Sequence, residues 1–242
     1  MNSVIITLTR RALLGKRRAL LLMLLPALLL GIAALVGAGN GADAAGASGF
    51  IQGFALGTLV PLICLLIGTG VIGPEIEDQS LIYLLAKPVR RGTIVLSKLA
   101  VAYGAAVVFA VIPTVAATWL AGGREADVLL AFGVTAALAS VTYVTVFFLL
   151  ATLTRNAVVV GLLYAVLWET VLGGYAPGVR ALSVRQWSLA PAEQIAGTQA
   201  ATWGIAAEVG LTTGLIAIAA TIVAGIVFSS RRLARLQLNT SE

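Results

Sequence analysis

Side chains that could carry acid–base, nucleophilic or metal chemistry are scarce in this chain of 242 residues. It has no histidine and a single cysteine, Cys64. Without histidine, neither a Ser–His nucleophile nor a histidine-ligated zinc site can form. The three aspartates, Asp43, Asp78 and Asp127, all lie outside the apolar runs, which excludes an intramembrane aspartyl pair. We therefore expect no catalysis, no metal site and no cofactor bound by this chain itself.

One carboxylate, by contrast, stands inside an apolar run. Glu169 follows Trp168 and lies about 14 residues beyond Arg155, or roughly 21 Å along a helix. A carboxylate inside a membrane span is costly and therefore marks a functional site. We predict that Glu169 and Trp168 belong to a gate or cavity. The alternative is a carboxylate close enough to the outer interface to be hydrated, or one bonded to a loop such as that holding Arg180 and Arg185.

Charged residues also cluster between residues 73 and 98. Three acidic residues, Glu75, Glu77 and Asp78, precede a short apolar stretch, and Arg91 follows it. Acidic residues at the start and basic residues at the end match the dipole of a short helix. Leu81, Leu84 and Leu85 would form one face of it, and Pro88 would end it. Roughly eight residues reach only about 12 Å, which is too short to cross a bilayer. We expect a short cytoplasmic helix here; the alternative is a solvated connector.

The composition around these residues is that of a membrane protein. Hydrophobic residues make up 60% of the chain and charged residues 11%, against about 45–50% and about 25% in soluble domains. So little charge cannot cover a water-soluble globule, which also excludes a soluble nucleic-acid-binding protein. The apolar runs are continuous rather than alternating, which favours an all-α polytopic protein over a β-barrel. Six runs approach the roughly 20 residues that a spanning helix needs: 19–38, 50–72, 99–121, 128–154, 157–174 and 203–229.

The basic residues orient these six predicted helices. With the N-terminus inside, thirteen of the sixteen basic residues fall in inner segments and three in outer ones, so we predict that both termini are cytoplasmic. The short run 157–174 is the least typical span. Residues 1–18 are expected to form an amphipathic arm at the inner interface, followed by an uncleaved first span rather than a signal peptide. The outer loop 175–202 is expected to hold a short interfacial or re-entrant helix.

The charged loop resembles a known family. The features that carry the resemblance follow the second apolar run in this order: Glu77, Leu81–Leu85, Pro88, Arg91 and Lys98. Their order and spacing are similar to those of the ABC-2 type permeases, the membrane subunits of one branch of ABC exporters. Gln79 and Ser80 depart mildly from the Gly-Thr that members often have. Trp168-Glu169 and the segment 177–186 resemble a bacterial subgroup of the same permeases.

This resemblance implies a fold and a division of labour. It implies six helices per subunit, a homodimer or heterodimer of such subunits in the bacterial plasma membrane, and a separate ABC ATPase on which the segment 75–91 docks as a coupling helix. ATP and Mg²⁺ would be bound by that ATPase, and the chain has no Gly-x-x-x-x-Gly-Lys-[Ser/Thr] phosphate loop of its own. The residues to which the resemblance assigns coupling are Glu75, Glu77, Asp78, Leu81, Leu84, Leu85, Pro88, Arg91 and Lys98.

Two other functions stay open beside an exporter permease. A membrane scaffold or force-transmitting subunit that passes no solute is the main alternative, because some relatives of this family are thought to work in that way. A proton-coupled carrier using Glu169 and Glu208 is the other. It is less favoured, because the runs contain neither histidine nor a basic partner for such a relay.

Overall fold

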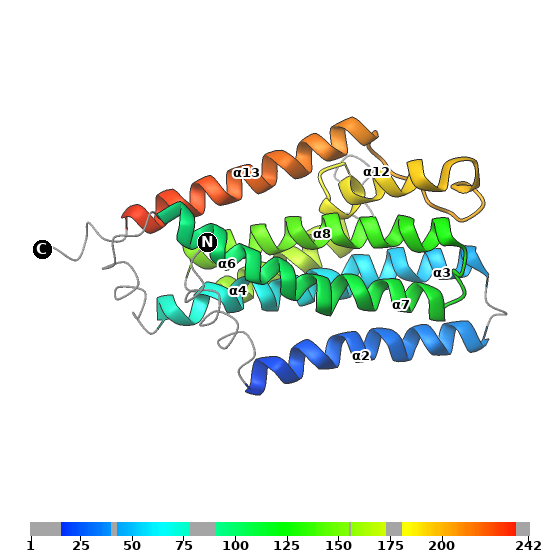
Figure 1. Cartoon of the computed structure of the whole chain (residues 1–242), viewed down its shortest axis with the longest axis horizontal. Helices are drawn as coiled ribbons and strands as arrows, with labels where there is room; N and C mark the ends of the chain where they lie inside the picture. Colours follow the sequence, from blue (N-terminus) through cyan, green and yellow to red (C-terminus); the bar gives the residue numbers. More distant parts are fainter. Residues whose placement is uncertain (1–15, 40–42, 78–90, 155, 173–180, 236–242) are drawn as a thin grey trace, which may run out of the picture.

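The computed structural model describes residues 16–39, 43–77, 91–154, 156–172 and 181–235. Within these residues the chain is helical apart from turns and short connections, and contains no strand. The long helices run side by side along an elongated bundle (Figure 1). In chain order the elements are α2 (Lys16–Gly39), α3 (Ala44–Phe50), η1 (Ile51–Leu59), α4 (Val60–Glu77), α6 (Arg91–Ala106), η2 (Val107–Val111), α7 (Ile112–Leu120), α8 (Ala126–Leu153), α9 (Ala157–Leu163), η3 (Tyr164–Leu172), α12 (Val184–Ala196), η4 (Gly197–Gln199) and α13 (Leu211–Arg235).

Several of these elements are long and apolar enough to cross a membrane. α3, η1 and α4 follow one another without a break, as do α6, η2 and α7. Five stretches among the described residues qualify by length and composition: Ala19–Gly39, Ala44–Gly73, Gly92–Leu120, Ala126–Leu153 and Leu211–Leu233. A shorter apolar helix, Ala157–Glu169, lies where the fifth span was expected. The chain is therefore a multi-pass membrane protein, while a sixth crossing stays a prediction.

The connection between the second and third spans differs from the expected loop 73–98. α4 continues to Glu77 and α6 begins at Arg91, so Glu75 lies in the last turn of α4 and Lys98 lies inside α6. The expected bounds followed hydrophobicity and therefore stopped near the first charged residue. Backbone hydrogen bonds, by contrast, can continue a helix through the polar residues at its end. Residues 78–90, where the short helix is expected, lie outside the described part of the chain.

The last helix also begins later than expected, at Leu211 instead of residue 203. Gly204 has φ 65°, a left-handed conformation that suits glycine and interrupts a helix. The backbone N–H of Glu208 donates to Oε1 of Gln186 in α12 at 3.2 Å. The segment before α13 is thus tied to α12, and Glu208 precedes the last helix instead of standing within it.

α8 is the centre of the bundle and contacts α4, α6, α7, α9, α12 and α13. Small side chains on α8 allow this close packing, and Ala131, Ala136 and Ala139 are at most 1% exposed. Its hydroxyl groups bond within the helix itself; Thr135, for example, donates to the carbonyl of Ala131 at 2.8 Å. Such internal bonds are required where no water reaches a polar group.

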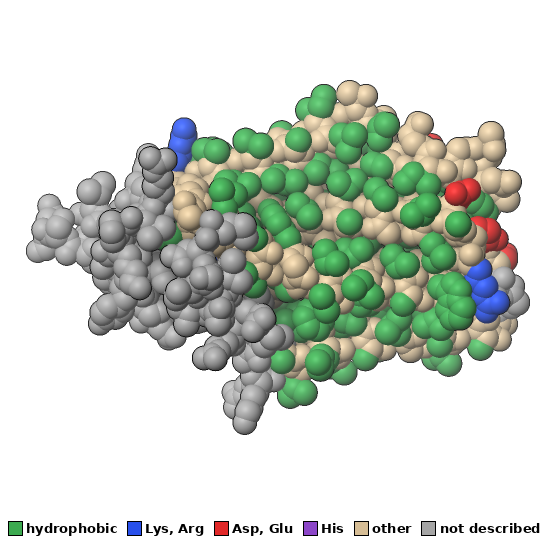
Figure 2. Space-filling view, viewed as in Figure 1, with side chains coloured by type: hydrophobic (Ala, Val, Ile, Leu, Met, Phe, Trp, Pro, Cys, Tyr) green, Lys and Arg blue, Asp and Glu red, His purple; other side chains and the backbone are tan. Residues whose placement is uncertain are grey.

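The surface of the bundle divides into an apolar middle and charged ends. Leu20 and Leu35 on α2 and Ile216 on α13 are 63–73% exposed, as suits side chains that face lipid rather than water. Figure 2 shows hydrophobic side chains over the middle, with acidic and basic side chains together at the end where α7 turns into α8. At the opposite end α2 begins, α4 ends, α6 begins and α13 ends (Figure 1).

Candidate functional site

The residues expected to couple to an ATPase flank the segment between α4 and α6. Glu75 and Glu77 lie in the last turn of α4, and Arg91 is the first residue of α6. Lys98 stands two turns further into α6. The remaining expected coupling residues lie outside the described part of the chain: Asp78, Leu81, Leu84, Leu85 and Pro88.

Lys98 joins the two helices that flank this segment. Its side chain is 0% exposed, and its Nζ donates to the backbone carbonyl of Val71 in α4 at 2.9 Å. An ammonium group that is removed from water needs hydrogen-bond acceptors. The bond to the carbonyl of Val71 is therefore strongly favoured over a buried ammonium without it. Val71 lies about two turns before the end of α4, and Lys98 about two turns after the start of α6. Lys98 therefore braces both helices just inside the connection.

A second group of polar side chains surrounds Glu169. The carboxylate is 0% exposed and accepts three hydrogen bonds. The hydroxyl of Ser183 donates to Oε2 at 2.5 Å. The backbone N–H of Val184 donates to Oε1 at 3.0 Å, and the hydroxyl of Tyr164 donates to the same oxygen at 3.3 Å. Glu169 is thus bonded to the segment that leads into α12 and contains Arg185, as the second of the two alternatives had it.

These bonds explain how α12 begins where it does. Ser183 is the N-cap residue of α12 but makes no capping hydrogen bond with its own side chain. The first amides of a helix lack intrahelical acceptors, and the carboxylate of Glu169 in η3 accepts from the first of them, that of Val184. The acceptor oxygen also lies at the positive end of the α12 dipole. Glu169 therefore acts as an external cap that fixes the start of α12 to η3.

A second contact ties the start of α12 to the other side of the bundle. Nη1 of Arg185 donates to the backbone carbonyl of Gln52 in η1 at 3.2 Å. Nε2 of Gln52 in turn donates to the carbonyl of Gly204 at 3.0 Å. Both η1 and η3 are π-helical, a conformation that frees backbone groups and often marks functional positions. The start of α12 is thus held between two π-helical stretches.

Aromatic rings close this cluster on the side of α8. The rings of Tyr143 and Phe147 stack with centroids 6.1 Å apart, and Phe147 meets Tyr164 edge-on at 6.0 Å. Tyr143 is 0% exposed, and its hydroxyl has no hydrogen-bond partner among the described residues. Trp168, which was expected to act with Glu169, is partly exposed.

The sequence singled out Glu169 but not the residues that bind its carboxylate. The loop that holds Arg185 was named only as an alternative partner. The three donors themselves, Tyr164, Ser183 and Val184, are ordinary residues that the fold brings to the carboxylate. We call Glu169, Tyr164, Ser183 and Arg185 the α12 anchor. Its arrangement fixes one helix against two others. Within the described residues, no three His, Cys, Asp or Glu side chains gather as metal ligands.

A family model described as ABC-2 family transporter protein matches residues 14–173. No curated protein sequence matches the chain. The matched region contains α2 and all the helices up to η3, including Lys98 and Glu169. Because this match covers well over half of the sequence, the chain belongs to the ABC-2 family of transporter proteins.

Proposed function

We propose that this chain is the permease subunit of an ATP-driven exporter in a bacterial plasma membrane. In this proposal two such subunits, identical or different, pair in the membrane. A separate ABC ATPase binds ATP and Mg²⁺ and docks on the segment 75–91. Membership of the ABC-2 family supports the general role, because permeases of this family typically work with an ABC ATPase. The direction of transport and the docking segment rest on the resemblance of residues 73–98 to the family pattern.

The observation that carries the proposal is the course of the helices on either side of residues 78–90. α3, η1 and α4 form one continuous helical stretch that ends at Glu77, and α6, η2 and α7 form another that starts at Arg91. Both run along the bundle towards its other end (Figure 1). The bond from Lys98 to Val71 braces them. A push on the connecting segment would therefore move two long helices together.

The α12 anchor supplies the other end of this mechanism. α12 packs against α8 and α13, and its first turn is held by Glu169 and by Arg185. Relative movement of η1 and η3 would change both contacts at once. In the proposed cycle, ATP binding in the partner shifts α4 and α6, and α12 follows through η1. Glu169 then serves the gate by positioning α12, and does not act as a proton donor.

The decisive experiment reconstitutes the chain in liposomes with its cognate ATPase and measures ATP hydrolysis and co-purification of the two proteins. We expect Glu77→Ala and Arg91→Ala to lower the permease-dependent hydrolysis at least several-fold while the ATPase still binds nucleotide. The matched control is Arg232→Ala, which removes an exposed charge at the same end of the bundle but outside the connection. Unchanged hydrolysis and unchanged association in both test variants would refute coupling through this segment.

The same preparation separates export from a purely mechanical role. The contacts between α4, α8 and α9 are tight: a Cβ on Gly68 would lie 2.8 Å from Cβ of Phe147, and one on Gly161 would lie 2.3 Å from Cδ1 of Leu65. This packing favours a route between subunits over one through a single subunit, and it equally suits a force-transmitting subunit. Coupled hydrolysis without ATP-dependent movement of any tested amphiphile across the liposome membrane would favour the mechanical role. Transport that stops with a protonophore while ATP is maintained would favour a proton-coupled carrier.

A further inference from the structure

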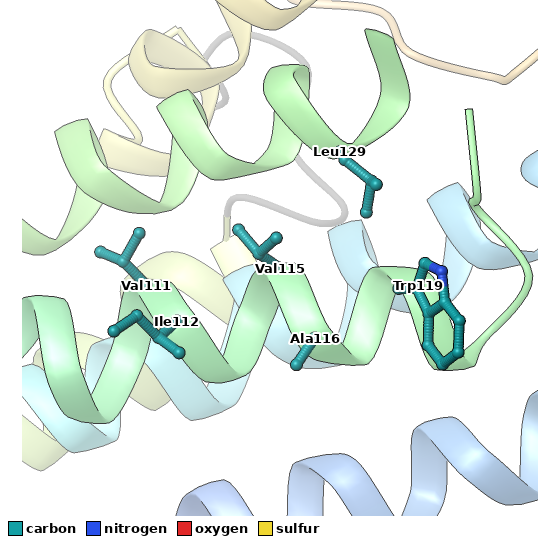
Figure 3. A pocket seen from close by; sticks show the side chains of 6 residues that line it. All are labelled: Val111, Ile112, Val115, Ala116, Trp119 and Leu129. Carbon is teal, nitrogen blue, oxygen red and sulfur yellow. The ribbon is translucent and has the colours of Figure 1, made fainter. Parts of the chain in front are cut away.

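An open groove follows the seam between α7 and α8 (Figure 3). Its volume is about 490 Å³. Only apolar side chains line it: Val111, Ile112, Val115, Ala116, Trp119 and Leu129. Val115 projects from α7 towards α8, Leu129 projects from α8 towards α7, and Trp119 stands at one end (Figure 3). Two of the lining residues, Ile112 and Trp119, are 57% and 50% exposed, so the groove opens on the outer surface of the bundle.

The end of the groove at Trp119 is charged. The guanidinium carbon of Arg124 lies 5.4 Å from the centroid of the Trp119 ring, which is a cation–π contact. Glu125 and Asp127 follow within three residues, at the N-cap and in the first turn of α8. All three charged side chains are exposed, and none of them forms an ion pair with another described residue. One positive and two negative charges therefore lie at the end of the bundle where the apolar groove reaches Trp119.

We propose that this groove is a binding site for one zwitterionic phospholipid, of the phosphatidylethanolamine type. The acyl chain lies along Val115 and Leu129, and the phosphate pairs with Arg124. The primary ammonium donates to Glu125 and Asp127. Val111 to Trp119 covers about 12 Å of helix, enough for a large part of one acyl chain. Trp119 carries Arg124 on its ring and therefore sits at the boundary between chain and headgroup, where tryptophan is favoured.

The charge pattern distinguishes this lipid from an anionic one. A phosphatidylglycerol headgroup offers a phosphate for Arg124 but no cation for Glu125 and Asp127, so the two carboxylates repel it. A phosphatidylethanolamine headgroup satisfies all three side chains, and its N–H groups can donate to the carboxylates. An exposed ion pair changes affinity only modestly, so we expect about a threefold preference for phosphatidylethanolamine over phosphatidylglycerol.

Quenching by brominated acyl chains measures this preference at Trp119. The protein is reconstituted in equimolar mixtures of the two lipids, with the bromine first on phosphatidylethanolamine and then on phosphatidylglycerol. The difference in fluorescence between the native protein and Trp119→Phe reports the Trp119 contribution. We expect this contribution to be quenched more strongly when phosphatidylethanolamine carries the bromine. The other tryptophans serve as internal controls for folding in each variant.

Three charge variants test the headgroup contacts. In Glu125→Gln combined with Asp127→Asn, the preference should disappear or turn towards phosphatidylglycerol, because Arg124 alone remains. In Arg124→Gln, quenching by both lipids should fall while the preference for phosphatidylethanolamine persists. Arg231→Gln removes an exposed charge at the opposite end and should leave the preference unchanged.

Two results would overturn the proposal. Equal quenching of Trp119 by both brominated lipids in the native protein would mean ordinary contact with surrounding lipid and no selective site. Absence of quenching by either lipid would mean that something else covers the groove. Chemical crosslinking at Ile112→Cys would then identify a second copy of the chain as the occupant. Neither result depends on coupling to an ATPase, so this test and that of the proposed function fail independently.

Discussion

Glu169 is a buried carboxylate whose hydrogen bonds belong to the start of another helix. Removing it in Glu169→Ala leaves the hydroxyl of Ser183 and the N–H of Val184 without an acceptor in a buried place. Each buried donor that loses its partner costs about 1–3 kcal/mol. We expect Glu169→Ala to lower the free energy of unfolding by several kcal/mol and Glu169→Gln, which keeps one acceptor oxygen, by distinctly less. Thermal unfolding of the purified protein in detergent measures both changes.

A double-mutant cycle assigns this loss to the α12 anchor. Ser183→Ala removes one of the three donors, so its effect should be smaller after Glu169→Ala than in the native protein. Coupling between contacting residues of one network is typically about 0.5–3 kcal/mol. Arg232→Gln, which removes an exposed charge, should change stability by less than about 0.5 kcal/mol. Fully additive effects of Ser183→Ala and Glu169→Ala would show that the bond does not hold α12.

At the scale of the helices, the approach of α2 to α7 depends on one glycine. A Cβ on Gly37 would lie 2.0 Å from the backbone oxygen of Leu120, whereas one on Gly31 meets nothing within 4 Å. Backbone cannot yield as a side chain does, so Gly37→Ala must separate the helices, with a typical loss of about 1–3 kcal/mol for overpacking. Gly31→Ala should instead be neutral or stabilise by up to about 1 kcal/mol. Thermal unfolding of the two variants compares them directly; equal stabilities would contradict this packing.

The brace between α4 and α6 makes a different prediction, which concerns motion and not stability. Lys98→Met keeps the approximate length of the side chain but loses the bond to the carbonyl of Val71. Spin labels on Gly73→Cys and Gly92→Cys, where an added Cβ meets nothing within 4 Å, report the distance between the helices in a Cys64→Ala background. We expect Lys98→Met to broaden the distance distribution measured by pulsed electron spin resonance.

The control for this experiment is another buried polar group that bonds only within its own helical stretch. Thr114 donates to the carbonyl of Ala110 at 2.7 Å, so Thr114→Val removes a buried hydrogen bond without disconnecting two helices. Its distance distribution should stay as narrow as that of the parent. A distribution that is equally narrow in Lys98→Met would show that side-chain packing alone holds α4 against α6.

The elements show which features the sequence can predict and which it cannot. Uninterrupted apolar runs predicted the long helices, because a membrane leaves backbone groups no other partners. The predicted ends of the helices were less accurate. α6 starts earlier than predicted, at Arg91, because a helix can extend beyond its apolar residues. α13 starts later than predicted, at Leu211, because Gly204 interrupts the helix before it. Two of the three partners of Glu169 lie 14 and 15 residues away, so the sequence offered a bond to that loop only as an alternative and could not name the donors. What the sequence did indicate was Glu169 itself, because it is an acidic residue among apolar ones.

At the scale of the whole molecule, the two ends of the bundle differ in their charges. The starts of α2 and α6 and the end of α13 lie at one end and carry runs of Lys and Arg: Lys16, Arg17 and Arg18, then Arg91, then Arg231, Arg232 and Arg235. The other end carries Arg124 beside Glu125 and Asp127. The positive-inside rule predicts that the end richer in cations faces the cytoplasm. This orientation decides on which side of the membrane the ATPase would dock and in which leaflet the proposed lipid site would lie.

Single cysteines at the two ends decide the orientation. In a Cys64→Ala background, Ser80→Cys marks the connection between α4 and α6, and Ala126→Cys marks the start of α8, where the native side chain is exposed. A membrane-impermeant maleimide applied to intact cells should label Ala126→Cys at once and Ser80→Cys only after permeabilisation. The reverse result would place the connection outside the cell, where no ATP-hydrolysing subunit could dock on it, and would remove the basis for coupling. The native protein, which keeps Cys64, is the control. Because Cys64 is 0% exposed, its labelling should be negligible in the folded protein, and any labelling reports an unfolded fraction.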